Sequence, residues 1–164
     1  MIDIVDNKIE EIIKVVHLNE PASNPLRLYF NLENINSNKS AFAIGITDDG
    51  ESIFFKHYSG PLSKKDIANE IDYGDVIAVE RLNDIYRLVG QVIVEVSYGN
   101  GIAEIMNNNQ AFIKRPVLYY FKLSFTKGTF LFFNDGDEGY YSFDKIEEIL
   151  AKDIYTYSWE PCPP

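Results

Sequence analysis

The sequence is poor in the residues on which catalysis and metal binding most often depend. Its 164 residues include one cysteine and two histidines. Two histidines without a neighbouring cysteine do not provide the ligand spacing of a structural zinc site. The sequence also lacks a glycine-rich phosphate loop and the Gly-x-Ser-x-Gly turn of many hydrolases. It therefore predicts a protein that is not an enzyme and that holds neither a metal ion nor a cofactor.

Long apolar runs and a secretion signal are lacking too. The chain opens with apolar and acidic residues, Met1-Ile2-Asp3-Ile4-Val5-Asp6, instead of a basic segment followed by an apolar one. No apolar run approaches the ~20 residues of a membrane span. The lone Cys162 cannot form a disulfide within the chain, which suits a reducing compartment. We therefore expect a cytoplasmic protein.

Positive charge is scarce relative to negative charge. The chain has 25 acidic and 15 basic residues, which gives a net charge of −10. Such a chain repels phosphate backbones and anionic lipid surfaces, so we expect no direct binding to nucleic acid or membranes. A partner with a basic surface is favoured, because complementary fields speed association.

The hydrophobic pattern predicts one α+β domain over residues 1–164. Ile9, Ile12, Ile13 and Val16 recur at helical spacing and predict a helix over 7–16. Alternating apolar and polar residues predict strands elsewhere. The expected strands are 26–32, 41–47, 52–57, 76–79, 85–88, 92–96, 118–125, 129–134 and 155–159, and the other expected helices are 63–71 and 144–150.

These elements predict a mostly antiparallel, twisted sheet with two or three helices packed on it, because runs of strands are joined by short turns. Residues 99–101, Gly-Asn-Gly, are expected to form a loop. Residues 102–113 remain open between a weak helix and no helix, since three consecutive asparagines oppose a stable one.

The acidic residues gather in two segments of the sequence, 135–153 and 66–80. A dense acidic face beside tyrosine and tryptophan is typical of a protein-binding surface, whereas charged solvated helix faces are the ordinary alternative. The candidate partner contacts are Asp135, Asp137, Glu138, Tyr140, Tyr141, Glu147, Glu148 and Trp159. The competing face would use Asp66, Glu70, Asp72 and Asp75.

Two stretches carry a resemblance to a protein class. One is Ser40-Ala41-Phe42-Ala43-Ile44-Gly45-Ile46-Thr47-Asp48-Asp49-Gly50, and the other is the expected helix and terminal strand that end at Trp159. With the acidity and the small size of the chain, they resemble the bacterial immunity proteins of polymorphic-toxin and contact-dependent growth inhibition systems. The resemblance implies a cognate toxin as partner, often a basic nuclease, which is neutralised by tight binding.

Two other function classes stay open at the level of sequence. A small hydrolase or ligand-binding domain would use paired carboxylates, and a cavity converging on two carboxyl groups would favour it. An anti-restriction protein that mimics DNA would carry evenly spaced carboxylates, but the basic residues Lys114, Arg115, Lys122 and Lys127 count against it.

Overall fold

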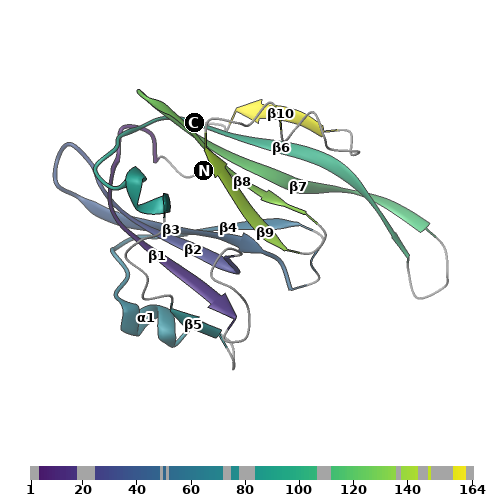
Figure 1. Cartoon of the computed structure of the whole chain (residues 1–164), viewed down its shortest axis with the longest axis horizontal. Helices are drawn as coiled ribbons and strands as arrows, with labels where there is room; N and C mark the ends of the chain where they lie inside the picture. The colour runs from purple at the N-terminus through teal and green to yellow at the C-terminus, as the bar shows by residue number, and fades with distance from the viewer. Residues whose placement is uncertain are drawn as a thin grey trace.

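Two five-stranded antiparallel sheets face each other in the computed structural model (Figure 1). The structure describes residues 4–17, 25–48, 50, 52–71, 75–77, 84–106, 112–135, 138–143, 148 and 157–161. The first sheet has the order β4-β3-β2-β1-β5 and the second β10-β6-β7-β8-β9. The first comprises β1 (Lys8–His17), β2 (Arg27–Glu33), β3 (Lys39–Ile46), β4 (Ile53–Tyr58) and β5 (Asp75–Ile77). The second comprises β6 (Ile93–Met106), β7 (Phe112–Phe125), β8 (Gly128–Asn134), β9 (Gly139–Phe143) and β10 (Tyr157–Pro161).

Helical structure is sparse, so the predicted α+β class with two or three packed helices is wrong. The described residues contain a five-residue α-helix, α1 (Lys64–Ala68), and a 3-10 helix, η1 (Asp84–Leu88). Ser63 and Asp66 form the expected capping box at the start of α1. Segment 85–88, predicted as a strand, lies in η1. The predicted helix over 144–150 lies outside the described residues except for Glu148.

The largest error concerns residues 7–16, which form the strand β1 instead of a helix. A β-bulge between Ile9 and Glu11 brings Ile9 and Ile12 to the face that packs against the second sheet. Ile13 is buried on the opposite face. Burial on both faces, combined with the bulge, reproduces the spacing of an amphipathic helix. The β-branched side chains of this segment suit a strand.

Other predicted strands are confirmed. Segment 26–32 corresponds to β2, and 41–47 with 52–57 form the hairpin β3–β4. Segments 118–125 and 129–134 pair as the end of β7 with β8. The terminal strand is present as β10.

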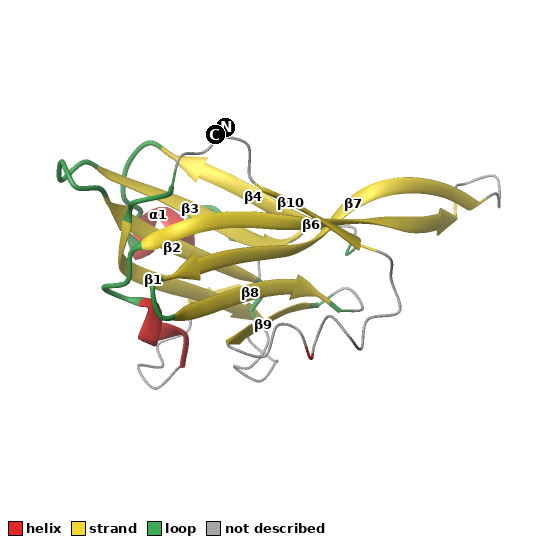
Figure 2. Ribbon diagram, turned by 90° about the horizontal axis from the view of Figure 1, so that it is seen from above, coloured by secondary structure: helices red, strands yellow, loops and turns green. Residues whose placement is uncertain are grey.

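The predicted loop at 99–101 is instead part of β6. Gly99 is needed there for space, because a Cβ atom would lie 2.9 Å from Cδ2 of Tyr120 on β7. Within the ambiguous segment 102–113, residues 102–106 end β6 and residues 112–113 begin β7, while 107–111 lie outside the described residues. In two perpendicular views, this end of the β6–β7 hairpin projects beyond the other strands (Figures 1 and 2).

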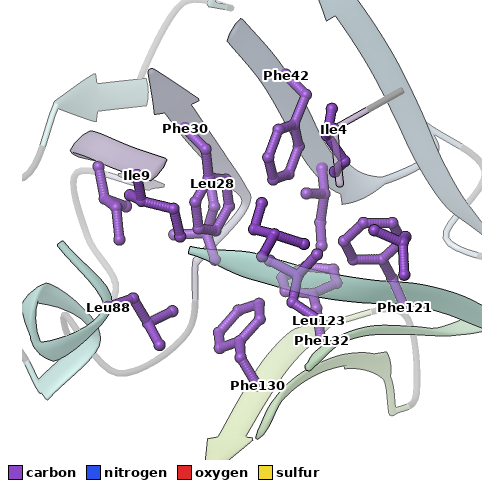
Figure 3. Close-up of a cluster of buried hydrophobic side chains, with 14 of the residues drawn as sticks. Ile4, Ile9, Leu28, Phe30, Phe42, Leu88, Phe121, Leu123, Phe130 and Phe132 are labelled. Carbon is purple, nitrogen blue, oxygen red and sulfur yellow. The ribbon is translucent and has the colours of Figure 1, made fainter. Parts of the chain in front are cut away.

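Aromatic and aliphatic side chains together fill the space between the sheets (Figure 3). Phe42 of β3 stacks on Phe30 of β2 at a centroid distance of 4.5 Å and on Phe55 of β4 at 5.1 Å. From the second sheet, Phe121 lies 6.0 Å from Phe42, and Phe130 lies 5.9 Å from Phe30. These ring contacts link the two layers and place Phe42 at their centre.

The outer face of the first sheet has a smaller core of its own. Ile13, Val15, Tyr29 and Ala43 are buried there together with Ile67 of α1. The short helix therefore covers part of this face. None of the helices among the described residues has the length and apolar character needed to span a membrane.

The two sheets are also joined through the backbone. The amides of Asp6 and Ile9 donate to the carbonyls of Ile93 and Gln91, at 2.8 and 3.0 Å. The C-terminal half of β1 uses the same edge to pair with β5. β1 thus contacts the second sheet near its amino-terminal end and pairs with β5 at its carboxyl-terminal end.

We expect Phe42→Ala to lower the free energy of unfolding by about 3–5 kcal/mol, because it leaves a cavity between the sheets. Urea denaturation measures this loss. The matched control is Ile35→Ser, whose side chain is 92% exposed and whose effect should stay within about 0.5 kcal/mol. Equal effects of the two substitutions would contradict the described packing.

Candidate functional site

Two hairpin turns distant in sequence meet at one end of the molecule. The side-chain amide of Asn134, at the end of β8, donates to the carbonyl of Gly50 in the β3–β4 turn at 2.6 Å. Gly139, at the start of β9, packs closely beside them. A Cβ atom on Gly139 would lie 2.7 Å from the carbonyl oxygen of Pro25 and 3.3 Å from Ile46. The β3–β4 and β8–β9 turns therefore form one continuous surface, which we call the acidic end.

The acidic end carries exposed carboxylates from both turns. Asp48 belongs to the β3–β4 turn, and Asp135 and Glu138 belong to the β8–β9 turn; all three side chains are exposed. Segments 47–52 and 134–139 contain no lysine, arginine or histidine. The same segments also contain Asp49, Glu51 and Asp137, which lie outside the described residues.

An aromatic pair lies beside these carboxylates. The hydroxyl of Tyr140 donates to the Glu138 carboxylate at 2.6 Å. The Tyr140 ring stacks on Phe133 with a centroid distance of 5.7 Å. Both rings are partly exposed. These contacts hold Glu138 and Tyr140, both predicted partner contacts, next to each other.

Tyr141 lies on the other face of β9 from Tyr140. Its hydroxyl donates to Asp84 at 2.8 Å, and the ammonium of Lys14 lies 5.7 Å from its ring centroid. Lys14 is only 2% exposed and projects from β1 toward the space between the sheets. Burial, followed by the hydrogen bond to Asp84 and then by the charge of Asp84, raises the pKa of Tyr141 above its ordinary value. The structure therefore separates Tyr141 from the acidic end.

The remaining candidate contacts are only partly described. Asp137 and Glu147 lie outside the described residues, and Glu148 is exposed. Trp159 lies on β10, where it pairs with Gly99 of β6. The structure brings together Asp135, Glu138 and Tyr140 from the predicted set and adds Asp48.

The competing acidic segment is tied into internal contacts. Asp66 accepts hydrogen bonds from the Ser63 hydroxyl and backbone amide, which lower the pKa of its carboxyl group. Glu70 contacts the Lys56 ammonium at 3.3 Å and accepts from the Tyr58 hydroxyl at 2.7 Å. Asp75 pairs with His17 through its backbone, and Asp72 lies outside the described residues.

A groove that no sequence pattern predicted lies at the amino-terminal end of β1. It has a volume of about 450 Å³ and is lined by Asp6, Lys8, Glu33, Asn34, Ile35 and Val92. Its walls come from three separate parts of the chain, so no local pattern reveals it. The one local signal is Ile35, a large apolar residue within the polar turn 34–38.

A metal centre finds no support in the part of the chain that the structure describes. No group of three or more histidine, cysteine, aspartate or glutamate side chains is arranged there to hold an ion.

Comparisons with protein-family models, with curated proteins and with solved structures give no match. The geometry of the acidic end is therefore the basis for assigning a function.

We expect Tyr141→Phe to change the alkaline behaviour of the protein. The raised pKa of Tyr141 contributes stability that is present below about pH 10, the ordinary tyrosine pKa, and lost as pH rises above it. The variant should lose about 1 kcal/mol of stability at neutral pH, where the hydrogen bond to Asp84 is removed. Its stability should fall less steeply than that of the wild type above pH 10.

Absorbance at 295 nm follows tyrosine ionisation directly. Tyr58, whose pKa is raised by burial and by Glu70, provides the comparison. Tyr58→Phe and Tyr141→Phe should each remove a similar part of the late-ionising signal. An unchanged late signal in Tyr141→Phe would contradict the contact with Asp84.

Proposed function

We propose that the protein is a binding protein that docks a basic surface of a protein partner through its acidic end. The observation that carries this proposal is the hydrogen bond between Asn134 and Gly50, which joins the two acidic turns. This hydrogen bond adds to the packing of Gly139 against Pro25 and Ile46. With both contacts, the carboxylates of the two turns form one surface that a single partner can contact.

The electrostatics favour this end over the competing segment. Asp48 and Asp135 lie exposed in turns without a basic residue. Asp66 and Glu70 instead accept contacts from their own chain. Exposed charges of one sign attract a partner of opposite sign over roughly a Debye length of 8–10 Å and raise the association rate.

Tyr140 supplies the aromatic part of this surface. Tyrosine is enriched among the residues that dominate binding energy, because it offers a large rigid ring with a polar tip. The hydrogen bond to Glu138 and the stacking on Phe133 restrict the Tyr140 side chain before binding. A restricted side chain loses less conformational entropy when a partner covers it.

The specific form of the proposal is neutralisation of a toxin in the bacterial cytoplasm. The net charge of −10 and the resemblance to immunity proteins of contact-dependent growth inhibition systems support it. The partner would be a toxin domain with a basic surface, such as a nuclease, which is blocked by occlusion.

The test uses the gene directly upstream and its product. We expect that gene to encode a toxin domain, co-expression of the present protein to restore growth, and the two purified proteins to form a complex. A neighbouring gene without a toxin domain, or a toxin domain that fails to bind at both low and high salt, would refute neutralisation.

We expect the double substitution Asp135→Asn, Glu138→Gln to lower the association rate with that toxin domain about three- to tenfold at low salt. The loss of two steering charges should also flatten the salt dependence of the rate. Surface plasmon resonance over a salt series measures both effects.

The control variant, Glu10→Gln with Glu95→Gln, makes the same change in net charge away from the acidic end. Its two carboxylates lie on β1 and β6 and accept contacts from Lys8 and Ser124. Equal rate reductions in both variants would assign the effect to overall charge and count against docking at the acidic end.

A further inference from the structure

The described residues expose few large apolar side chains, and two of them line the groove at the start of β1. Val5, Ile35, Val89, Val92 and Val94 have exposed fractions from 37% to 92%. Ile35 and Val92 line the groove itself, where Val92 forms a β-bridge with Lys8. Exposed apolar surface concentrated beside a groove, with polar residues at its rim, is typical of an interaction site.

Ile35, the most exposed of these residues, is presented by a well-ordered turn. The side-chain oxygen of Asn34 accepts hydrogen bonds from the amides of Asn36 and Asn38 at 2.9 and 3.0 Å. The amide of Asn34 donates to the carbonyl of Asn38 at 3.0 Å, which closes the turn. A large apolar residue on a pre-organised turn costs little conformational entropy to bind.

Backbone conformations that side chains rarely adopt also occur here. Asp6 and Ser37 are the two non-glycine residues with positive φ in the described part of the chain, both at 61°. Asp6 lines the groove, and Ser37 lies in the turn that carries Ile35. Such conformations persist where surrounding contacts impose them, and they occur often at binding sites.

The charges around the groove select the chemistry of its occupant. The Lys8 ammonium contacts Glu10 at 2.6 Å and Glu33 at 3.6 Å. The hydrogen bond between Lys8 and Glu10 raises the pKa of the lysine and lowers that of the glutamate. Lys39 pairs with Glu33 between β2 and β3, and its charge also lowers the pKa of Glu10. Asp6, Glu10 and Glu33 outnumber Lys8 and Lys39 by one charge, and the exposed Asp6 lines the groove, so the groove favours a basic occupant. A second copy, also at net −10, is disfavoured.

We propose that this groove binds an extended segment of a protein partner in which an aliphatic side chain neighbours a lysine or arginine. The aliphatic group lies between Ile35 and Val92, and the basic group lies near Asp6 and Glu33. The groove is separate from the acidic end, because β2 begins beside the acidic end and its last residue, Glu33, lines the groove. The inference therefore does not rest on the function proposed above.

The probe is a synthetic peptide of seven residues, built from glycine and serine, with a central leucine flanked by two lysines. Titration into the ¹⁵N-labelled protein should give saturable amide shifts at Lys8, at residues 34–38 and at Val92. A peptide with serine in place of leucine, and one with glutamates in place of the lysines, should bind at least several-fold more weakly.

Ile35→Ser should weaken binding of the leucine–lysine peptide about tenfold or more, because it removes one large apolar contact. Glu33→Gln should weaken binding a few-fold and reduce its salt dependence. Asp48→Asn, which removes one carboxylate at the acidic end, is the matched control for charge and should leave the affinity unchanged. Ile35→Ser should fold normally, since its side chain is exposed.

Four results would overturn the proposal. They are the absence of saturable shifts at millimolar peptide, equal binding of the glutamate peptide, and shifts confined to segments 47–52 and 134–139. The fourth is a concentration-dependent dimer, measured by light scattering, that Ile35→Ser abolishes, which would assign the groove to a second copy. Equal binding of the glutamate peptide, or shifts confined to the acidic end, would show that the peptide is not recognised at the groove.

Discussion

The structure depends on β1, a strand that is buried on both faces and hydrogen-bonded along both edges. Ile12 faces the second sheet, and Ile13 faces the smaller core beneath α1. One edge pairs with β2, and the other pairs with residues 90–93 and then with β5. Because each face and each edge has a partner, the register of β1 fixes both sheets relative to each other.

Charge is distributed according to this framework. Carboxylates beside the first sheet and η1 are used internally, as Glu70 is by Lys56 and Asp84 by Tyr141. The carboxylates in the β3–β4 and β8–β9 turns lie beyond the ends of the strands, where no basic residue belongs to either turn. Among the described residues, Asp48, Asp135 and Glu138 therefore place exposed negative charge at this end of the molecule.

The sequence predicted β2 because its apolar residues alternate with polar ones, although both faces of this strand are buried, at Leu28 on one side and at Tyr29 on the other. It failed for β1, where burial on both faces and a bulge imitate helical spacing. Asp135 and Glu138 were identified from local acidity. Asp48 lies on the same surface because the Asn134 side chain donates a hydrogen bond to the Gly50 carbonyl. These two residues are 84 positions apart, so no local pattern reveals the contact. The groove was missed for the same reason, because its walls come from three distant segments.

The two surfaces act over different ranges, and this difference separates their roles in binding. Exposed carboxylates at the acidic end attract a partner over about 8–10 Å and act mainly on association. Apolar contacts at Ile35 and Val92 form only at van der Waals distance, so they act mainly on dissociation. Since β2 runs from one surface to the other, a partner that used both would lie along the sheet. Its affinity would then depend on salt through one end and on side-chain shape through the other.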